Sequence, residues 1–486
     1  MPLDQAEVAR ILGVDVPPLP EPITSVTHDS RAVSRGAAFV AIKGFTVDGA
    51  DFVPQALERG ASLIVASHEI PGVPTAVVPD DRVALAALAT ELAGNPSHEL
   101  TVYGITGTNG KTTSSYVLHA ILTAAYGETA TGLMTTAEVI IGKHHSMSVR
   151  TTGEAPQVQG NLVRMRSAGV THVVLETSSH GIHLHRVDGT RYAAALFTNL
   201  TRDHLDLHGT MEDYYLTKRK LFEWTDGPTL ANADDAYGRR MAGEIEGMRT
   251  FGESDGVDYR ISDVRRQGAR TVFSLTTPDH GVLELHTPLL GDYNVHNVAG
   301  ASAIALETGM SADVLVKAVA EMGQVPGRFE RVPAAVERGF EVVVDYAHTE
   351  IGLRAVLEVA REVARGHGPD ARLICVFGAA GDRDKAKRPL MGEVASELAD
   401  IAIITTDDAY SEDPQTIADE VASGANLSRT RIVVDRRKAI WEALQVARTG
   451  DVIVVAGKGH ERVQHLPDGD IDFHDVTVVT ELIGQL

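Results

Sequence analysis

The segment 104–113, GITGTNGKTT, places three glycines before a lysine and two threonines. Glycine backbones can approach phosphate oxygens closely, a lysine can reach the outer phosphates, and a threonine hydroxyl can hold Mg²⁺. The usual pattern for such a loop, G-x-x-x-x-G-K-[ST], would need glycine at 105, where this chain has Ile105. The apolar run 100–105 predicts a strand before the loop, and the segment 112–126 predicts a helix after it. This order favours a nucleotide-binding loop over a helix-capping turn with an incidental lysine.

Acidic residues and histidines form further candidate sites. Glu176 follows the apolar run 173–175. In a parallel sheet this strand end faces the ligand edge, and a carboxylate there suits Mg²⁺. The segment TRDHLDLH contains Asp203, His204, Asp206 and His208. Such alternation is also common in ordinary polar loops, so the segment alone leaves a metal site and a plain loop both open.

The segment 212–222, EDYYLTKRKLF, contains the run Lys218, Arg219 and Lys220. The usual meaning of such a run is a solvated basic helix face. A buried lysine would have a lowered pKa and a neutral, reactive amine. The sequence shows only that the lysine is present.

The composition limits the class of protein. The 486 residues carry a formal net charge of −22, which argues against nucleic acid and anionic membranes as partners. No apolar run approaches the roughly 20 residues of a membrane span, and the N-terminus lacks a secretory signal. Cys375 is the only cysteine and lies in an apolar run, so it is expected to be buried and inert. We therefore expect a cytoplasmic protein whose site gathers positive charge locally for any anionic substrate.

Short apolar runs alternate with helical patterns along the whole chain, which predicts an α/β protein with largely parallel sheets. The expected strands are 37–42, 62–67, 100–106, 171–177, 194–200, 372–378, 401–407 and 451–457. The segment 81–94 has helical spacing. Pro/Gly-containing hinges at 94–99 and 324–330 predict three domains, at 1–98, 99–325 and 326–486.

Motifs along essentially the whole chain resemble the Mur ligase family, the ATP-dependent amide-forming enzymes of peptidoglycan synthesis. These are TGTNGKTT and the segments 29–57, 176–189, 197–222, 291–301, 325–330, 344–349, 377–392 and 455–461. The glycine spacing of 104–113 is normal in that family. The resemblance implies a central P-loop-type domain between an N-terminal UDP-binding α/β domain and a C-terminal Rossmann-like domain. Within the family the chain looks most like the MurE subclass, which adds the third amino acid to UDP-N-acetylmuramoyl-L-Ala-D-Glu.

The resemblance also implies residue roles. The ATP-binding residues would be Gly107, Thr108, Asn109, Gly110, Lys111, Thr112, Thr113, Asn297, Arg328, Asp345 and His348. The catalytic and Mg²⁺-binding residues would be Lys111, Thr112, Glu176, His204 and Lys218, with Lys218 carbamylated by CO₂. The UDP-sugar peptide would meet Ser30, Arg31, Thr151, Thr152, Ser178 and Arg186. Gly153 stands where the family usually has proline, which is expected to loosen that loop without removing the site.

The residues that would bind the incoming amino acid are Arg383, Asp407, Asp408, Tyr410, Gly457 and Glu461. Relatives that add meso-diaminopimelate resemble one another in a D-N-P-R motif, whose arginine pairs with the distal carboxylate. Here the motif is D-D-A-Y, so Asp408 replaces asparagine and Tyr410 replaces arginine. The distal carboxylate would lose its partner and meet a repelling charge, which costs several kcal/mol. We therefore expect a basic diamino acid, with L-lysine favoured over L-ornithine or diaminobutyrate.

Other functions remain possible from the sequence. A folylpolyglutamate-type ligase is disfavoured by the first-domain segment 29–57, and a meso-diaminopimelate-adding enzyme by Tyr410. A related ligase with another acceptor in a specialised pathway stays open. A non-catalytic nucleotide-binding scaffold is disfavoured because four candidate catalytic residues are all present: Lys111, Glu176, His204 and Lys218. The expected enzyme is a monomer that consumes ATP, with a UDP-MurNAc-dipeptide and a free diamino acid as substrates.

Overall fold

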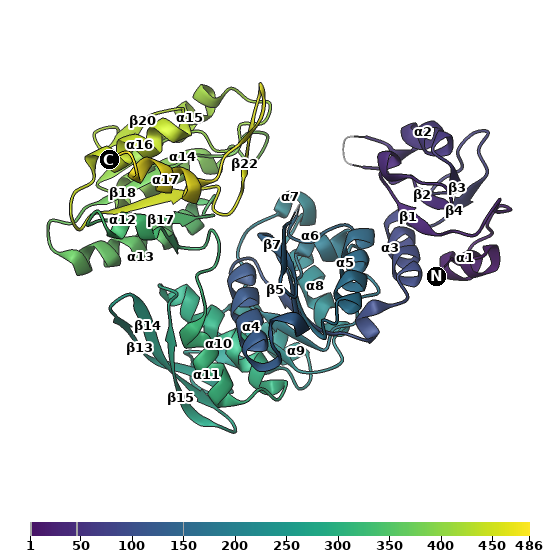
Figure 1. The fold of residues 1–486 in the computed structure, drawn as a ribbon, viewed down its shortest axis with the longest axis horizontal. Helices are drawn as coiled ribbons and strands as arrows, with labels where there is room; N and C mark the ends of the chain where they lie inside the picture. The colour runs from purple at the N-terminus through teal and green to yellow at the C-terminus, as the bar shows by residue number, and fades with distance from the viewer. Residues whose placement is uncertain (1, 45–46, 149) are drawn as a thin grey trace. The chain divides into compact units, whose positions relative to one another are not determined.

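The computed structural model of the chain describes residues 2–44, 47–148 and 150–486. The motif segment 29–57 therefore includes two positions, 45 and 46, that lie outside the described residues. The chain divides into two compact units, one comprising 1–287 and 292–322 and the other comprising 288–291 and 323–486 (Figure 1).

The first unit begins with a four-stranded, fully parallel sheet in the order β1-β2-β3-β4. Its strands are β1 (Ser25–Thr27), β2 (Ala37–Val40), β3 (Ala61–Ala66) and β4 (Thr75–Val77). The helices of this part are α1 (Gln5–Leu12), η1 (Ser30–Ala32), η2 (Gly49–Phe52), α2 (Val53–Glu58), α3 (Asp81–Leu92) and η3 (Pro96–His98). Helix α3 begins where the Asp80 carboxylate accepts from the N–H groups of Arg82 and Val83.

An eleven-stranded sheet forms the rest of the first unit, in the order β15-β14-β13-β12-β11-β10-β5-β9-β6-β7-β8. Its central strands pair in parallel and are β5 (Thr101–Thr106), β6 (Thr131–Met134), β9 (His172–Glu176), β10 (Ala194–Phe197), β11 (Thr229–Asn232) and β12 (Arg249–Gly252). Antiparallel pairs form both edges, with β7 (Glu138–Ile141) and β8 (His144–Met147) at one and β13 (Tyr259–Gln267), β14 (Arg270–Thr277) and β15 (Gly281–Thr287) at the other. The prediction of largely parallel sheets therefore holds for the middle of this sheet, whereas its antiparallel edges were not predicted.

Helices cover this sheet and position the candidate site. They are α4 (Lys111–Tyr126), η4 (Glu128–Ala130), α5 (Ala155–Ser167), α6 (Ser179–His183), α7 (Leu205–His208), α8 (Met211–Glu223), α9 (Ala236–Glu244), α10 (Asp292–Glu307) and α11 (Ala312–Glu321). Helices α4 and α10 pack side by side (Figure 1). Beneath α8, a core that includes Tyr192, Phe197 and Leu221 is almost completely buried. Burying such large side chains stabilises the sheet by about 1.5–3 kcal/mol each and fixes the strand ends that carry Glu176 and the glycine loop.

The second unit has a six-stranded sheet in the order β16-β17-β21-β18-β19-β20, in which only the β16–β17 pair is antiparallel among the described strands. The strands of this unit are β16 (Glu330–Arg331), β17 (Glu341–Asp345), β18 (Leu373–Phe377), β19 (Ile401–Ile404), β20 (Thr430–Ile432) and β21 (Val452–Ala456), with a separate hairpin of β22 (Val463–Leu466) and β23 (Gly469–Asp472). The helices are α12 (Pro333–Val336), α13 (Glu350–His367), α14 (Lys387–Leu398), α15 (Pro414–Ala422), α16 (Arg436–Val446) and α17 (Asp475–Ile483).

The eight apolar runs predicted as strands all contain strands, and the helix predicted at 81–94 is confirmed. Cys375 is fully buried within β18, as predicted. Along the described residues, no helix has both the length and the apolar character needed to cross a membrane.

Candidate active site

The loop between β5 and α4 has a backbone that favours glycine. Gly107 has φ 153° and Gly110 has φ 83°, both in the region that L side chains rarely adopt. A Cβ added at Gly110 would lie 2.1 Å from Asn297 Oδ1. The loop is therefore pressed against Asn297 on α10, which brings a nucleotide-binding candidate from far along the chain to the glycines. Helix α4 begins directly after the loop, and the N-terminal end of a helix favours an anion.

The polar side chains of this loop are ordered by contacts within the first unit. Lys111 Nζ donates to the carbonyl of Thr108 at 2.8 Å, and the N–H of Asn109 donates to Asn199 Oδ1 at 2.9 Å. Thr112 and Thr113 lie buried in the first turn of α4. The predicted phosphate-binding residues thus come together at one helix N-terminus.

Glu176 lies at the end of β9, next to the glycine loop. Its side chain is almost fully buried, at 1% exposed, and its Oε2 accepts from Thr112 Oγ1 at 3.0 Å. The same oxygen accepts from the backbone N–H of Thr136 at 2.9 Å. Sequence reasoning missed Thr136, because nothing near it in the chain marks it as a partner of Glu176.

Lys218 does not lie on a solvated basic face. Its side chain is buried within α8, and its Nζ donates to the carbonyl of Gly107 at 2.7 Å. The same nitrogen lies 4.6 Å from the centre of the Tyr214 ring. Burial, reinforced by the nearby charge of Lys111, lowers the pKa of Lys218 well below its usual value. The neutral amine is the form that can react with CO₂.

His204 lies just before α7, in a left-handed backbone conformation with φ 52°. Its Nε2 is 3.4 Å from Asp203 Oδ2, and its ring meets that of His180 edge-on, with centroids 4.6 Å apart. The His204 side chain is 43% exposed, and its partial desolvation lowers its pKa, which favours the neutral imidazole that can ligate a metal. His208 is buried and stacks on Tyr214.

The family implies Mg²⁺ at this place, and the side chains present fit that ion. Thr112 and Glu176 supply adjacent oxygen donors, the type that Mg²⁺ prefers. Lys111 Nζ bonds the carbonyl of Thr108 and Lys218 Nζ bonds that of Gly107, so both lysines lie at the same loop as Thr112. An ammonium at Lys218 cannot ligate a cation, whereas a carbamate there can.

Two candidates for the UDP-sugar lie in the four-stranded sheet region. Ser30 is buried in η1, and its Oγ donates to Gln55 Oε1 at 2.5 Å. Arg31 is highly exposed and pairs with Asp29 at 2.9 Å. The exposed guanidinium is thus available to an anionic ligand, while Ser30 is tied into the fold.

Three further candidates for binding the UDP-sugar peptide belong to the hydrogen-bond network around Glu176. Thr152 Oγ1 donates to the carbonyl of Glu176 and shares a hydrogen bond with Ser178 Oγ, each at 3.0 Å. Thr151 Oγ1 accepts from Thr136 Oγ1 at 3.0 Å. The structure therefore brings Thr151, Thr152 and Ser178 to the same strand end as the candidate metal ligand.

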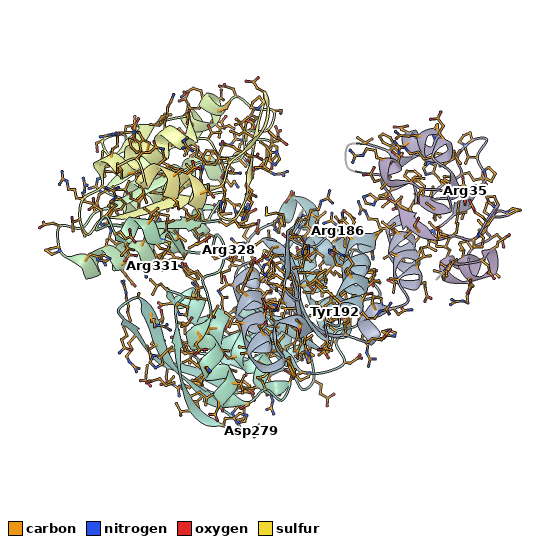
Figure 2. The ribbon with its side chains drawn as sticks, viewed as in Figure 1. Arg35, Arg186, Tyr192, Asp279, Arg328 and Arg331 are labelled. Atoms are coloured by element: carbon orange, nitrogen blue, oxygen red, sulfur yellow. The ribbon has the colours of Figure 1, made fainter. Side chains whose placement is uncertain are left out.

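Arg186 (Figure 2) extends this network toward a buried acid. Its Nη1 donates to the carbonyl of Thr152 at 3.2 Å, and its Nη2 pairs with Glu154 Oε1 at 2.8 Å. Glu154 also pairs with Arg150 and, at 3.6 Å, with Arg82. Sequence reasoning missed Glu154, although it directly follows the Thr-Thr-Gly segment.

The remaining nucleotide candidates belong to the second unit. Arg328 (Figure 2) places its guanidinium 4.6 Å from the centre of the Tyr346 ring. Asp345 is buried at the end of β17 and accepts from the N–H groups of Phe329 at 2.6 Å and Ala347 at 2.8 Å. Burial raises the pKa of Asp345. His348 Nδ1 donates to the carbonyl of Tyr346 at 2.8 Å.

The amino-acid candidates Asp407, Asp408 and Glu461 gather around one lysine that sequence reasoning missed. Lys458 Nζ, which is fully buried, lies 2.8 Å from Asp408 Oδ1 and 2.9 Å from Glu461 Oε2. Gly457 has φ 115°, and a Cβ there would meet Asp407 Oδ2 at 2.3 Å. The charge of Asp408 is therefore offset by Lys458. The repulsion predicted between Asp408 and a distal carboxylate is therefore much weaker. The argument against a distal carboxylate then rests on the missing arginine.

Tyr410 lies between Arg383 and the histidine of the hairpin. The Arg383 guanidinium is 5.4 Å from the Tyr410 ring centre, and the Tyr410 ring stacks on His465 with centroids 5.2 Å apart. Tyr410 occupies the position of the motif arginine, and Arg383 is a cation beside its ring. The structure thus brings together the six predicted amino-acid-binding residues, within a single unit.

Three family models match the chain. They are the Mur ligase family, catalytic domain, at residues 22–93; the Mur ligase middle domain at 105–305; and the Mur ligase, glutamate ligase domain at 327–459. The chain is 39% identical to the UDP-N-acetylmuramoyl-L-alanyl-D-glutamate–2,6-diaminopimelate ligase 1 of Clostridium acetobutylicum, covering 96% of this chain and 95% of that protein. It is 40% identical to the corresponding ligase of Gloeobacter violaceus, covering 99% and 98% of the two chains.

A solved structure of a UDP-N-acetylmuramoyl-L-alanyl-D-glutamate–2,6-diaminopimelate ligase also matches. The TM-score is 0.68 at 30% sequence identity, over 100% of this chain and 99% of that one. The resemblance expected from the motifs is confirmed, with the three-domain architecture and the ATP-dependent ligase class that go with it. The chain belongs to the Mur ligase family.

Proposed function

We propose that the chain joins the amine of a diamino acid to the D-Glu carboxylate of UDP-N-acetylmuramoyl-L-Ala-D-Glu, using ATP, in peptidoglycan precursor synthesis. The observation that carries this proposal is the grouping of Lys111, Thr112, Glu176 and Lys218 around one glycine loop. The names of the two relatives above, each matched along nearly its whole length, support the acceptor.

We assign the polyphosphate of ATP to the loop from Gly107 to Thr113, with Asn297 beside it, and further nucleotide contacts to Arg328, Asp345 and His348. The acceptor would meet Ser30, Arg31, Thr151, Thr152, Ser178 and Arg186. We assign the domain boundaries to 1–98, 99–325 and 326–486. Because ATP and a UDP-activated sugar are the substrates, we propose that the chain acts in the cytoplasm, as a monomer.

The first chemical step would be attack of the acceptor carboxylate on the γ-phosphorus of ATP, which releases ADP and forms an acyl phosphate. Lys111 would offset the charge of the two approaching anions, and the N-terminus of α4 would hold the phosphates. Thr112, Glu176, His204 and Lys218 would hold Mg²⁺. The bound ion would supply further charge neutralisation at the phosphates. The amine of the diamino acid would then attack the acyl carbon, losing a proton as phosphate leaves and the amide forms.

We propose that Lys218 carries a carbamate. Its burial and lowered pKa favour the neutral amine, which adds to CO₂ with release of one proton. The resulting anion would offer oxygen donors next to Glu176. It would also remove the cost of burying an ammonium beside Lys111.

The relatives' names favour 2,6-diaminopimelate as the amino acid, ahead of the L-lysine expected from the motif. One specific observation supports a second candidate, a basic diamino acid such as L-lysine or L-ornithine. Tyr410 replaces the motif arginine, and Arg383 lies beside its ring. The three carboxylates of Asp407, Asp408 and Glu461 surround the single charge of Lys458, and this excess of acid suits the ammonium that both candidates share.

The test is ATP-dependent phosphate release by the purified chain with UDP-N-acetylmuramoyl-L-Ala-D-Glu and, in turn, meso-diaminopimelate, L-lysine, L-ornithine and diaminobutyrate. We expect release only when the acceptor and a diamino acid are both present. The ratio of kcat/KM values decides between the two candidate classes. If folded protein that binds ATP releases no phosphate with any of these amino acids, the proposal is contradicted. That result would favour another acceptor in a specialised pathway.

A further inference from the structure

Two loops of the second unit carry the residues that would contact the incoming amino acid. One follows β18 and contains Arg383, and the other follows β19 and contains Tyr410. Strands β18 and β19 are parallel neighbours, so both loops leave the same edge of the sheet. The distance between Arg383 and Tyr410 therefore depends on what connects the loops.

Glu412 connects them, although it lies outside the motif that singled out Tyr410. Its Oε1 accepts from the backbone N–H of Asp382 at 2.6 Å, in the opposite loop. Its Oε2 pairs with Lys385 Nζ at 2.8 Å, also in that loop. One carboxylate thus bonds the 407–412 loop to two points of the 378–385 loop.

Arg388, on helix α14, binds the carboxylate of Glu412. The side chain is fully buried, and its Nη1 and Nη2 donate to the two oxygens of Glu412 at 3.0 and 2.9 Å. Its Nη2 also donates to the carbonyl of Ala380 at 3.1 Å. A bidentate pair of this kind fixes orientation as well as distance. The neighbouring cations hold the pKa of Glu412 well below its usual range, which keeps it ionised.

A second connection runs in the opposite direction. Asp382 accepts from the N–H of Ser411 at 3.1 Å and from its hydroxyl at 2.8 Å. Asp382 and Tyr410 both have left-handed backbones, with φ 52° and 50°. Non-glycine residues hold this conformation when the surroundings determine it. The two loops therefore form one fixed element, which presents Arg383 and Tyr410 together.

We propose that Glu412, held by Arg388, is a positioning residue for the incoming amino acid. It touches no reacting atom in this account, and acts by fixing the separation of Arg383 and Tyr410. The inference rests on the proposed function, since it concerns how that reaction's second substrate is bound. Its loss lowers affinity for the amino acid and leaves ATP and the acceptor bound as before.

The test is Glu412→Gln, compared with the wild type by steady-state kinetics for all three substrates. We expect the KM for the preferred amino acid to rise about tenfold or more, with the KM values for ATP and acceptor changed less than about twofold. The matched control is Glu420→Gln. Glu420 is a second carboxylate on Arg388, at 2.5 Å, and lies on α15, outside both loops. The KM of the Glu420→Gln variant for the amino acid is expected to stay within about twofold of the wild-type value.

Ser411→Ala gives a milder second variant, because it removes only the hydroxyl bond to Asp382. We expect an intermediate rise in the amino-acid KM, so the inference is tested even if Glu412→Gln fails to fold. An unchanged amino-acid KM in the folded variants overturns the inference, as does a parallel rise for all three substrates or an equal rise in Glu420→Gln. Wild-type protein inactive with every diamino acid contradicts the proposed function instead, so the two failures are distinguishable.

Discussion

At the residue scale, Lys218 shows why a sequence pattern and its surroundings must be considered together. In the sequence it is one of three consecutive basic residues, which is typical of a solvated helix face. In the structure its side chain is buried against the Gly107 carbonyl, and its pKa is lowered. That environment suits a reactive amine and does not suit a surface charge.

Carbamylation of Lys218 has a direct spectroscopic test. In ¹³C-bicarbonate, the wild type is expected to show a carbamate carbon signal in its NMR spectrum, because the buried amine is neutral enough to react. Lys218→Arg is expected to lack the signal and to lose activity by about 100-fold or more, since an electrostatic group at a phosphoryl-transfer site contributes at this level. The matched control is Lys220→Arg on the same helix, which keeps both signal and activity. An identical signal in Lys218→Arg would contradict the assignment.

Tyr410 offers a second residue-scale prediction. Tyr410→Arg, alone and with Asp408→Asn, restores the arginine and then the asparagine of the D-N-P-R motif, while Ala409 stays in place of its proline. A new charge-assisted pair with the distal carboxylate contributes roughly 1.5–3 kcal/mol. We therefore expect the kcat/KM ratio of meso-diaminopimelate to L-lysine to rise about tenfold or more over the wild type. Tyr410→Phe is the control, because it keeps the ring on His465 and adds no charge. A ratio unchanged by the arginine would show that Tyr410 does not face the distal group.

At the scale of elements, the glycine loop makes a sharp prediction. Gly110→Ala would place a Cβ 2.1 Å from Asn297 Oδ1 and would strain a backbone with φ 83°. We expect the Kd for ATP to rise about tenfold or more, because the loop must move away from α10. The control is Gly127→Ala at the other end of α4, where φ is 87° and no atom lies within 4 Å of the added Cβ. Calorimetry that shows equal ATP affinity for both variants would contradict the role given to this loop.

Elements were predictable where one local pattern decides them. The apolar runs predicted every strand assigned from them, because a buried parallel strand is apolar along its whole length. Strands β13 and β15 were not predicted, because polar residues interrupt their apolar positions and leave no continuous apolar run.

The candidate site followed the same rule. The glycine loop and Glu176 could be identified because they adjoin a strand. The pairings of Glu154 with Arg186, Asp408 with Lys458, and Glu412 with Arg388 could not, because each joins segments from 24 to 50 residues apart.

At the scale of the whole molecule, the two compact units imply two separable contributions to stability. The second unit contains an ion pair that is completely buried on both sides, in which Arg436 Nε and Nη2 bond the carboxylate of Asp475 at 2.8 and 2.7 Å. Such a pair leaves an uncompensated charge when one partner is removed. The stability of this unit should therefore depend strongly on Asp475.

We expect Asp475→Asn to destabilise residues 323–486 by about 3–5 kcal/mol. In scanning calorimetry one unfolding transition should move to lower temperature, while the transition of the first unit stays in place. The neighbouring exposed pair of Arg437 and Glu481 provides the control, and Glu481→Gln should cost less than about 1 kcal/mol. A single transition that shifts as a whole would show that the units unfold together.

The central claim is that the whole molecule makes one amide bond between a UDP-sugar dipeptide and a diamino acid. The most direct measurement is the mass of the product formed from ATP, UDP-N-acetylmuramoyl-L-Ala-D-Glu and an equimolar mixture of meso-diaminopimelate, L-lysine, L-ornithine and diaminobutyrate. We predict an acceptor heavier by one diamino acid less one water, with one ADP formed for each product. An acceptor of unchanged mass, from protein that binds ATP, would contradict it.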